Sequence, residues 1–207
     1  MTEIKILEPI QKTKDFNQLD LLFKIHRLKK IRRKLSSKLS SIEQLIISEN
    51  QENYKHRFQA LKTIISENDI NYKQVTSQLK DCNNLYKFCN ILKENNQYLL
   101  NLKKERKKGR IDSEAYELTK GHYLQKIIDI KNNFEDLKTI ARLYFQELKD
   151  EVISSEDKRI QIITERTKKA INKKEFNEKI KENDDSKQLL EEKLAFLKVK
   201  IIDYELE

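Results

Sequence analysis

Apolar residues recur along this chain at alternating spacings of three and four. An a/d heptad pattern that is sustained over several heptads predicts a coiled coil rather than a simple surface helix. Asn68 is the polar member of the first run, and one buried Asn in such a seam can fix register or strand number at some cost in stability. The run comprises Phe58, Leu61, Ile65, Asn68, Tyr72, Val75, Leu79, Cys82, Tyr86 and Cys89.

Two further runs follow the same rule. The second comprises Tyr116, Lys120, Tyr123, Ile127, Ile130, Phe134, Leu137, Ala141, Tyr144 and Leu148, and the third Leu190, Leu194, Leu197, Ile201 and Tyr204. The third run must pack on the rest of the chain or on another copy, because an isolated helix of about 20 residues is marginal in water. Of these two arrangements we favour self-association.

The stretch "ERKKGRIDSEAYEL", residues 105–118, predicts the end of one helix and the start of the next. Gly109 fits the position after a helix end, where a left-handed conformation costs glycine nothing. Asp112 is a good N-cap, and Ile111 and Tyr116 have the spacing of a hydrophobic staple. The arms 54–102 and 113–150 are therefore expected to form an antiparallel hairpin. The basic run Lys103, Lys104, Arg106, Lys107 and Lys108 then has a structural role, because cations stabilise the C-terminal end of a helix.

Two local features bear on continuity and packing. "IISENQENYK" at 46–55 returns as "IISENDINYK" at 64–73. Eighteen residues are about five helical turns, so Ile47 and Tyr54 would join the seam of one continuous helix. The alternative is a hinge at Ser48, where a capping box can be written, and the sequence does not decide the state of residues 48–53. Gly121, inside the second arm, is expected to permit close packing.

These patterns predict an all-α protein, an elongated coiled coil with a long antiparallel helical hairpin. The composition agrees, with 37% charged residues, 2 Gly and 1 Pro. We expect a short extended segment over 1–14, a basic amphipathic helix over 15–45, and the coiled-coil hairpin over 46–155 with its turn at 107–112. A C-terminal helical segment would fill 156–207, with a break at 183–186.

One helix is cationic on almost every face. Residues 24–38, "KIHRLKKIRRKLSSK", hold eight basic residues and no acid in a chain of formal net charge +9. Such a helix indicates a surface for anionic lipid, nucleic acid or an acidic partner. The alternative is that its apolar stripe (Leu21, Ile25, Leu28, Ile31, Leu35 and Leu39) packs in a bundle and the charges are only solvated. The predicted binding residues are Lys24, Arg27, Lys29, Lys30, Arg32, Arg33, Lys34 and Lys38.

The turn motif also resembles part of a known family. Leu102, Arg106, Gly109, Ile111, Glu114 and Tyr116, followed by heptads, are similar to the turn of archaeal coiled-coil proteins of the CdvA-type cell-division family. The likeness covers about a third of the chain, around residues 95–155. It implies a scaffold that is associated with DNA and membrane surfaces and that recruits ESCRT-III-like polymers.

Catalytic chemistry finds little support in the sequence. Two isolated glycines cannot form a phosphate-cradling loop, and His26, His56 and His122 stand apart without metal-ligand spacing. We therefore expect no enzyme, cofactor, metal site or small-molecule substrate. The expected protein is a cytoplasmic scaffold, peripheral at a membrane, which forms a homo-oligomer or pairs with a partner coiled coil. The alternative is a nucleic-acid-binding coiled coil, and the sequence specifies neither the oligomeric state nor the strand orientation.

Overall fold

The computed structural model describes residues 9–49, 52–79 and 85–205, and over these the chain is all-α, with no strand. The helices fall into two units, Met1–Asn84 and Leu85–Glu207, each of which is described by itself. The expected all-α fold class is confirmed.

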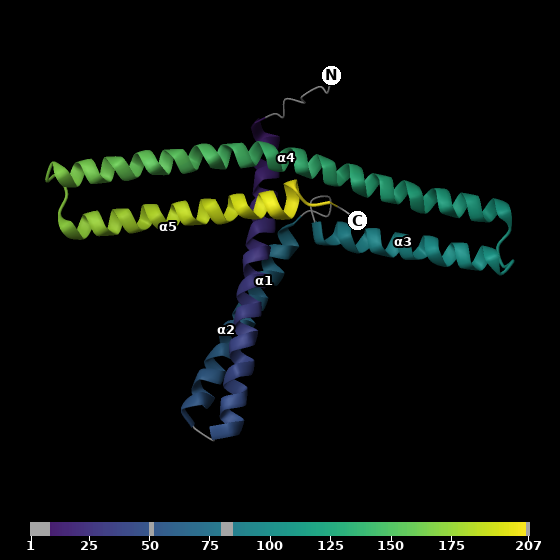
Figure 1. Ribbon diagram of the computed structural model, residues 1–207, viewed down its shortest axis with the longest axis horizontal. Helices are drawn as coiled ribbons and strands as arrows, with labels where there is room; N and C mark the ends of the chain where they lie inside the picture. The colour runs from purple at the N-terminus through teal and green to yellow at the C-terminus, as the bar shows by residue number, and fades with distance from the viewer. Residues whose placement is uncertain (1–8, 50–51, 80–84, 206–207) are drawn as a thin grey trace. The chain divides into compact units, whose positions relative to one another are not determined.

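The first unit is an antiparallel hairpin of α1 (Pro9–Glu49) and α2 (Glu52–Gln78) (Figure 1). Arg32 Nε lies 2.8 Å from Asp69 Oδ1, and Lys29 Nζ lies 5.7 Å from the ring centroid of Tyr72. These contacts pair earlier residues of α1 with later ones of α2. The facing sides bury Leu22, Ile25, Asn68, Val75 and Leu79.

The expected limits of the first helix need correction. α1 begins at Pro9 rather than at residue 15, because proline has the backbone angle of a first helical turn and lacks the N–H that would be unpaired there. Residues 9–14 of the expected extended segment are thus helical, and its residues 1–8 lie outside the described residues. α1 ends at Glu49 and α2 begins at Glu52, so the first copy of the repeated decapeptide does not lie in one continuous helix. Ile47 is accordingly 80% exposed rather than part of a seam.

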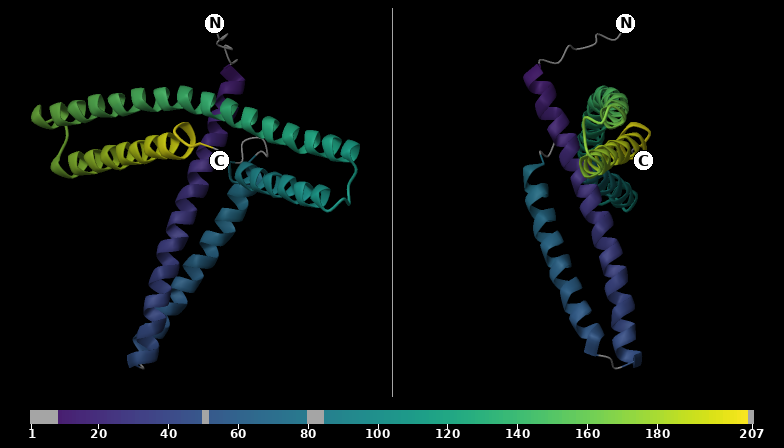
Figure 2. Two further views of the ribbon diagram at one scale, coloured as in Figure 1. Left: turned by 45° about the vertical axis from the view of Figure 1, so that its right-hand side comes forward. Right: turned by 90° about the vertical axis from the view of Figure 1, so that its left-hand side faces the viewer.

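The second unit is built on one long helix. α4 (Ser113–Thr167) packs against α3 (Leu85–Lys107) along its first half and against α5 (Lys173–Leu197) along its second half (Figures 1 and 2). A π-helix, η2 (Lys198–Ile202), follows α5 and also contacts α4. The second predicted run forms the inner face of α4, where it is half-buried near the start and buried from Ile130 to Leu148.

The third predicted run completes this core from the chain's own end. Leu197 and Ile201 are fully buried, and the ring of Tyr204 meets that of Phe134 edge-on at 6.1 Å. The hydroxyl of Tyr204 also lies 3.7 Å from Cys89 Sγ on α3. The last segment therefore folds back on α4, the arrangement that we did not favour.

Two expected boundaries are wrong. The hairpin does not extend over 46–155: α2 pairs with α1, and the expected arm 54–102 consists of α2 and α3. The heptad pattern does not predict this change of partner helix, because the a/d spacing continues unchanged across residues 80–84. These residues, which include Cys82, lie outside the described residues. The expected break at 183–186 is absent, since α5 continues through it. Asn172 caps this helix instead, so the Asp185–Gln188 spacing was not a helix start.

The turn at 107–112 has the hydrogen bonds of a Schellman motif. Gly109 has φ +69°, its N–H donates to the Arg106 carbonyl at 3.0 Å, and the Arg110 N–H donates to the Glu105 carbonyl at 3.1 Å. Asp112 then caps α4 by accepting from the Ala115 N–H at 2.8 Å. Each bond satisfies a backbone group that a helix end leaves unpaired.

A second turn between α4 and α5 repeats this design. Lys169 has φ +59°, its N–H donates to the Arg166 carbonyl at 3.0 Å, and the Ala170 N–H donates to the Glu165 carbonyl at 2.8 Å. Asn172 and Glu175 form a reciprocal capping box. The sequence does not predict this turn, because lysine, unlike glycine, has no preference for turn positions.

The two turns belong to an internal repeat of 60 residues. Residues 85–144 align with 145–204, and their inner faces share buried positions at Phe88/Leu148 and Asn95/Ser155. Leu137 and Leu197 are buried, as are Ala141 and Ile201 at the next matched position. The second unit is thus two similar hairpins that share α4. Identical pairs are Glu105/Glu165, Arg106/Arg166, Lys108/Lys168, Ile111/Ile171, Leu137/Leu197, Lys138/Lys198 and Tyr144/Tyr204.

Candidate anionic-surface site

The eight predicted binding residues all lie on α1 and are accessible. Lys29 is half-buried, and the other seven are exposed: Lys24, Arg27, Lys30, Arg32, Arg33, Lys34 and Lys38. Because a helix turns by about 100° per residue, these side chains do not share one face. Their roles therefore separate by position around the helix.

Two of the cations face α2. Arg32 pairs with Asp69, with both side chains substantially exposed, and Lys29 lies over the Tyr72 ring. An exposed ion pair adds at most about 1 kcal/mol to stability, so these contacts mainly align the hairpin. Arg32 and Lys29 therefore belong to the hairpin interface and are the weaker candidates for binding.

Four cations form a stripe on the opposite side, which we call the outward face: Arg27, Lys30, Lys34 and Lys38. Spacings of three and four place them on one side of the helix, while Arg32, two residues from both Lys30 and Lys34, falls on the other. The stripe covers about 16 Å of helix at 1.5 Å per residue. No acid lies within residues 24–38 to neutralise it.

Three cations of the outward face have no acidic partner elsewhere among the described residues. Within the described parts of the chain, Lys30, Lys34 and Lys38 form no ion pair, and the Arg27 guanidinium lies 5.8 Å from the Phe23 ring one turn earlier. Like charges one turn apart destabilise a helix by roughly 0.2–0.5 kcal/mol per pair. A bound anion would relieve this repulsion.

The apolar stripe of α1 is largely occupied by the hairpin. Leu28, Leu35 and Leu39 are half-buried on the side that carries Arg32, whereas Ile31 is 41% exposed beside the outward cations. Insertion of the whole stripe into a bilayer would require α1 to separate from α2. The geometry therefore favours contact through charge over deep insertion.

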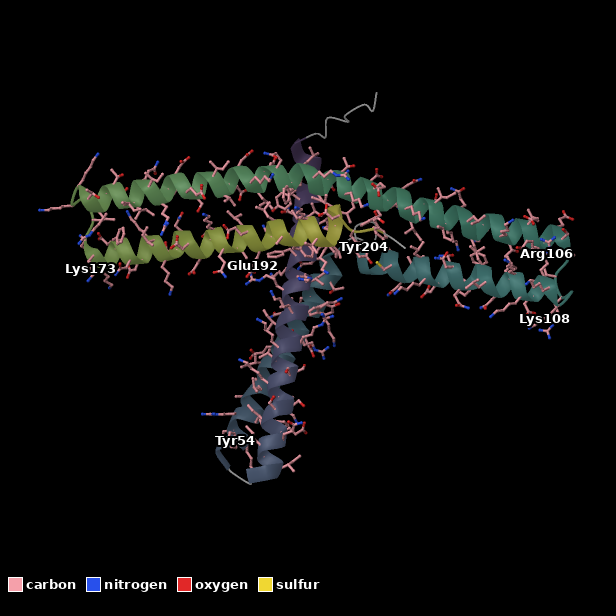
Figure 3. The ribbon with its side chains drawn as sticks, viewed as in Figure 1. Tyr54, Arg106, Lys108, Lys173, Glu192 and Tyr204 are labelled. Carbon is pink, nitrogen blue, oxygen red and sulfur yellow. The ribbon has the colours of Figure 1, made fainter. Side chains whose placement is uncertain are left out.

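The basic run at the α3–α4 turn is arranged differently. Lys108 and Arg110 both bond the Glu105 carboxylate, at 2.8 and 3.0 Å, and these hydrogen bonds hold the pKa of Glu105 below its usual value. Arg106 pairs with Glu117 at 3.3 Å and lies 4.3 Å from the Tyr116 ring centroid. Arg106 and Lys108 are marked at this end of α4 in Figure 3.

The predicted turn residues take the places that this geometry requires. Gly109 supplies the left-handed position and Asp112 the cap, while Ile111 and Tyr116 are half-buried beneath the turn. Arg106 and Lys108 of the basic run, together with Arg110, are thus committed to the turn, and Lys103, Lys104 and Lys107 remain exposed on α3. The corresponding turn at 168–172 could have been found from "ER", Lys and Ile recurring 60 residues later.

The groove of the second unit is lined by polar groups that bond one another. A groove of about 720 Å³ lies between α4 and α5, where Ser155 Oγ and Asn183 Oδ1 are 3.2 Å apart and Asn183 Nδ2 donates to the Ser155 carbonyl at 3.1 Å. Nearby, Lys187 bonds Glu156 at 2.8 Å, which lowers the pKa of that carboxyl. The described residues contain no cluster of His, Cys, Asp and Glu with the geometry of a metal site.

No described helix is long and apolar enough to cross a membrane. Comparison of the chain with protein-family models, with curated proteins and with solved structures gives no match.

Proposed function

We propose that this protein is a non-enzymatic helical scaffold that holds an anionic surface against the outward face of α1. The observation that carries the proposal is the stripe Arg27, Lys30, Lys34 and Lys38, exposed and without an acid within residues 24–38. Near an anionic membrane each such cation contributes about 1 kcal/mol. The rest of α1 and α2 would hold the stripe straight.

The resemblance of the Gly109 turn to the CdvA-type family supplies a setting for this proposal. In that setting the protein works in archaeal cell division or ESCRT-type membrane remodelling, bound peripherally to the membrane and paired with other copies or a partner coiled coil. It needs no cofactor and no small-molecule substrate.

Nucleic acid is the second candidate for the anionic partner. The specific observation in its favour is that Leu28, Leu35 and Leu39 are half-buried in the hairpin, so the exposed face is almost purely cationic. Phosphate contacts from Lys and Arg supply most of non-specific nucleic-acid binding. The two partners differ in whether an apolar side chain is required.

Binding of the full chain to anionic vesicles and to a DNA duplex tests the proposal. Reversal of the outward stripe (R27E, K30E, K34E and K38E together) is expected to weaken binding at least 100-fold while helix content is kept, because Glu is about as good a helix former as Lys or Arg. The matched control reverses four exposed cations of α2: K55E, R57E, K62E and K73E. It makes the same change in net charge and is expected to lose much less affinity.

One further variant separates the two partners. Ile31→Ser removes the exposed apolar residue beside the stripe, and it should weaken vesicle binding several-fold but leave DNA binding unchanged. Equal binding by the outward-face variant and the parent would contradict the proposal. Equal losses in the two four-residue variants would reduce it to an effect of net charge.

A further inference from the structure

Gly121 is a destabilising residue inside a helix, and no contact within the described chain explains its presence. It lies inside α4, where glycine costs roughly 0.5–1 kcal/mol relative to alanine. A Cβ built at this position would meet nothing within 4 Å, so the expected close packing inside the chain is absent. The missing side chain leaves room on the outside of the helix.

The surface around Gly121 carries two glutamates and one exposed leucine. The exposed side of α4 at this point is formed by Ser113, Glu114, Glu117, Leu118 and Gly121. Leu118 is 70% exposed. Glu114 has no ion pair among the described residues, whereas Glu117 bonds Arg106 and Lys120. We call this surface the α4 notch.

The repeat places the opposite charge at the matching positions of α5. Glu114 corresponds to Lys174, and Gly121 corresponds to Lys181. Both lysines are exposed. Lys174 Nζ lies 3.9 Å from Glu178 Oε1, a long ion pair and the one that Lys174 forms among the described residues. We call this surface the α5 start.

The α5 start also breaks a local rule. Lys173 and Lys174 occupy the first turn of a helix, where the partial positive charge of the backbone disfavours cations. Local rules that a fold breaks without an internal gain are expected at functional positions. Here the exposed Glu114 near Gly121 and the exposed lysines at the start of α5 carry opposite charges.

The notch and the α5 start cannot meet within one chain. They lie at the two ends of the second unit, as Arg106 and Lys173 show in Figure 3, and α4 between them has 55 residues, about 80 Å of helix. A contact between them therefore requires two molecules. The aliphatic stem of a lysine can cover an apolar surface while its ammonium group reaches a carboxylate.

We propose that the α4 notch binds the α5 start of a second copy of this chain. Gly121 lets the incoming helix approach, Leu118 packs on lysine stems, and Lys174 and Lys181 reach Glu114 and Glu117. The contact joins different surfaces of the two molecules, so one copy keeps a free α5 start and the other keeps a free notch. Such heterologous contacts propagate into a ring or an open filament.

Sedimentation velocity of the full chain over a concentration series tests this assembly. The parent is expected to associate, and Gly121→Gln is expected to weaken association at least tenfold by filling the notch. The same variant should raise Tm by about 2–4 °C, because it replaces glycine with a good helix former. Thr139→Gln, an exposed change farther along α4, is the matched control and should leave association unchanged.

Charge exchange identifies the two surfaces. Glu114→Lys and Lys174→Glu should each abolish association alone, and an equimolar mixture of the two chains should restore it, because each notch then finds an α5 start of opposite charge. A parent that stays monomeric at every concentration would overturn the proposal. So would a Gly121→Gln chain that is more stable yet associates like the parent, or a mixture that does not recover. The variant with the four outward cations of α1 reversed should still assemble, which separates this contact from anion binding.

Discussion

The outward face of α1 and the basic run of the α3–α4 turn look alike in sequence and differ in structure. Both are dense in Lys and Arg. In the turn, Lys108 and Arg110 both form ion pairs with Glu105. Arg106 forms an ion pair with Glu117 and lies over the Tyr116 ring. On the outward face, Lys30, Lys34 and Lys38 have no such partner among the described residues.

The comparison shows that a cation count does not identify a binding surface. Acids placed within reach of a basic run indicate that its charge stabilises the fold, as Glu105 does at the turn. Absence of acids over several turns leaves the charge available to another molecule. We therefore expect the two regions to respond differently to the same number of charge reversals.

Charge reversal in the turn run gives the largest contrast. The variant K104E, R106E, K108E and R110E reverses the three cations that the acids of the turn bind and matches the four-residue variant of α1 in net charge. We expect at most a fivefold loss of affinity for anionic vesicles or DNA, against at least 100-fold for α1, together with a lower Tm as cations leave a helix C-terminus. Affinity and a thermal scan of the same samples check this. A loss as large as that of α1 would make the turn part of the binding site.

The two turns of the second unit sharpen the comparison through their left-handed residues. Lys169→Gly should stabilise the unit by about 1 kcal/mol, because a side chain in the left-handed region costs roughly 1–2 kcal/mol and glycine avoids it. Gly109→Lys should destabilise it by a similar amount. Urea unfolding measures both, and the two changes combined should nearly cancel, since the sites are far apart. Destabilisation by Lys169→Gly would show that the lysine side chain supports its turn.

Asn68 tests the first unit in the same way. It is buried, and its Oδ1 has no hydrogen-bond partner among the described residues. Asn68→Leu should raise the free energy of unfolding by about 1–2 kcal/mol, because an unsatisfied buried oxygen is removed and apolar surface is buried. Chemical denaturation followed by circular dichroism checks the sign. Loss of stability would mean that Asn68 has a partner, and a change in oligomeric state would show that it selects strand number.

The smallest expected effect concerns Glu105. Hydrogen bonds from Lys108 and then Arg110 lower its pKa in the folded state. A carboxyl with a lowered folded pKa stabilises the fold above its unfolded pKa, and this stabilisation is lost as pH falls through the folded pKa. Glu105→Gln should therefore lower Tm slightly at pH 7 and leave it unchanged at pH 2. An equal loss at both pH values would mean that packing, not charge, is responsible.

Sequence patterns predicted the parts of the fold that depend on local chemistry. The inner face of α4 follows from apolar spacing, and the first turn follows from Gly109 and Asp112, residues whose backbone preferences are strong. Pairing of the arms was not predictable, because seams in the same heptad phase do not say which helix lies opposite. The second turn was missed because Lys169 has no preference for the conformation that the Schellman hydrogen bonds impose on it.

The residue range of the candidate site was predictable from the sequence, but the side of α1 that is free to bind was not. Absence of acid over residues 24–38 marked α1, yet only the position of α2 separates Lys29 and Arg32 from the outward stripe. Gly121 and Lys174 were not linked by any sequence pattern that we recognised. Their relation depends on the 60-residue repeat, which the structure makes evident through its two turns.

The salt dependence of polyanion binding tests the central claim most directly. With a DNA duplex as the polyanion, four phosphate contacts from Arg27, Lys30, Lys34 and Lys38 predict that log K falls with log salt concentration with a slope of about −3 to −4. The variant with these four residues reversed should bind with little remaining slope. The same steep slope in parent and variant would show that other cations make the contact, and would contradict the assignment of binding to the outward face of α1.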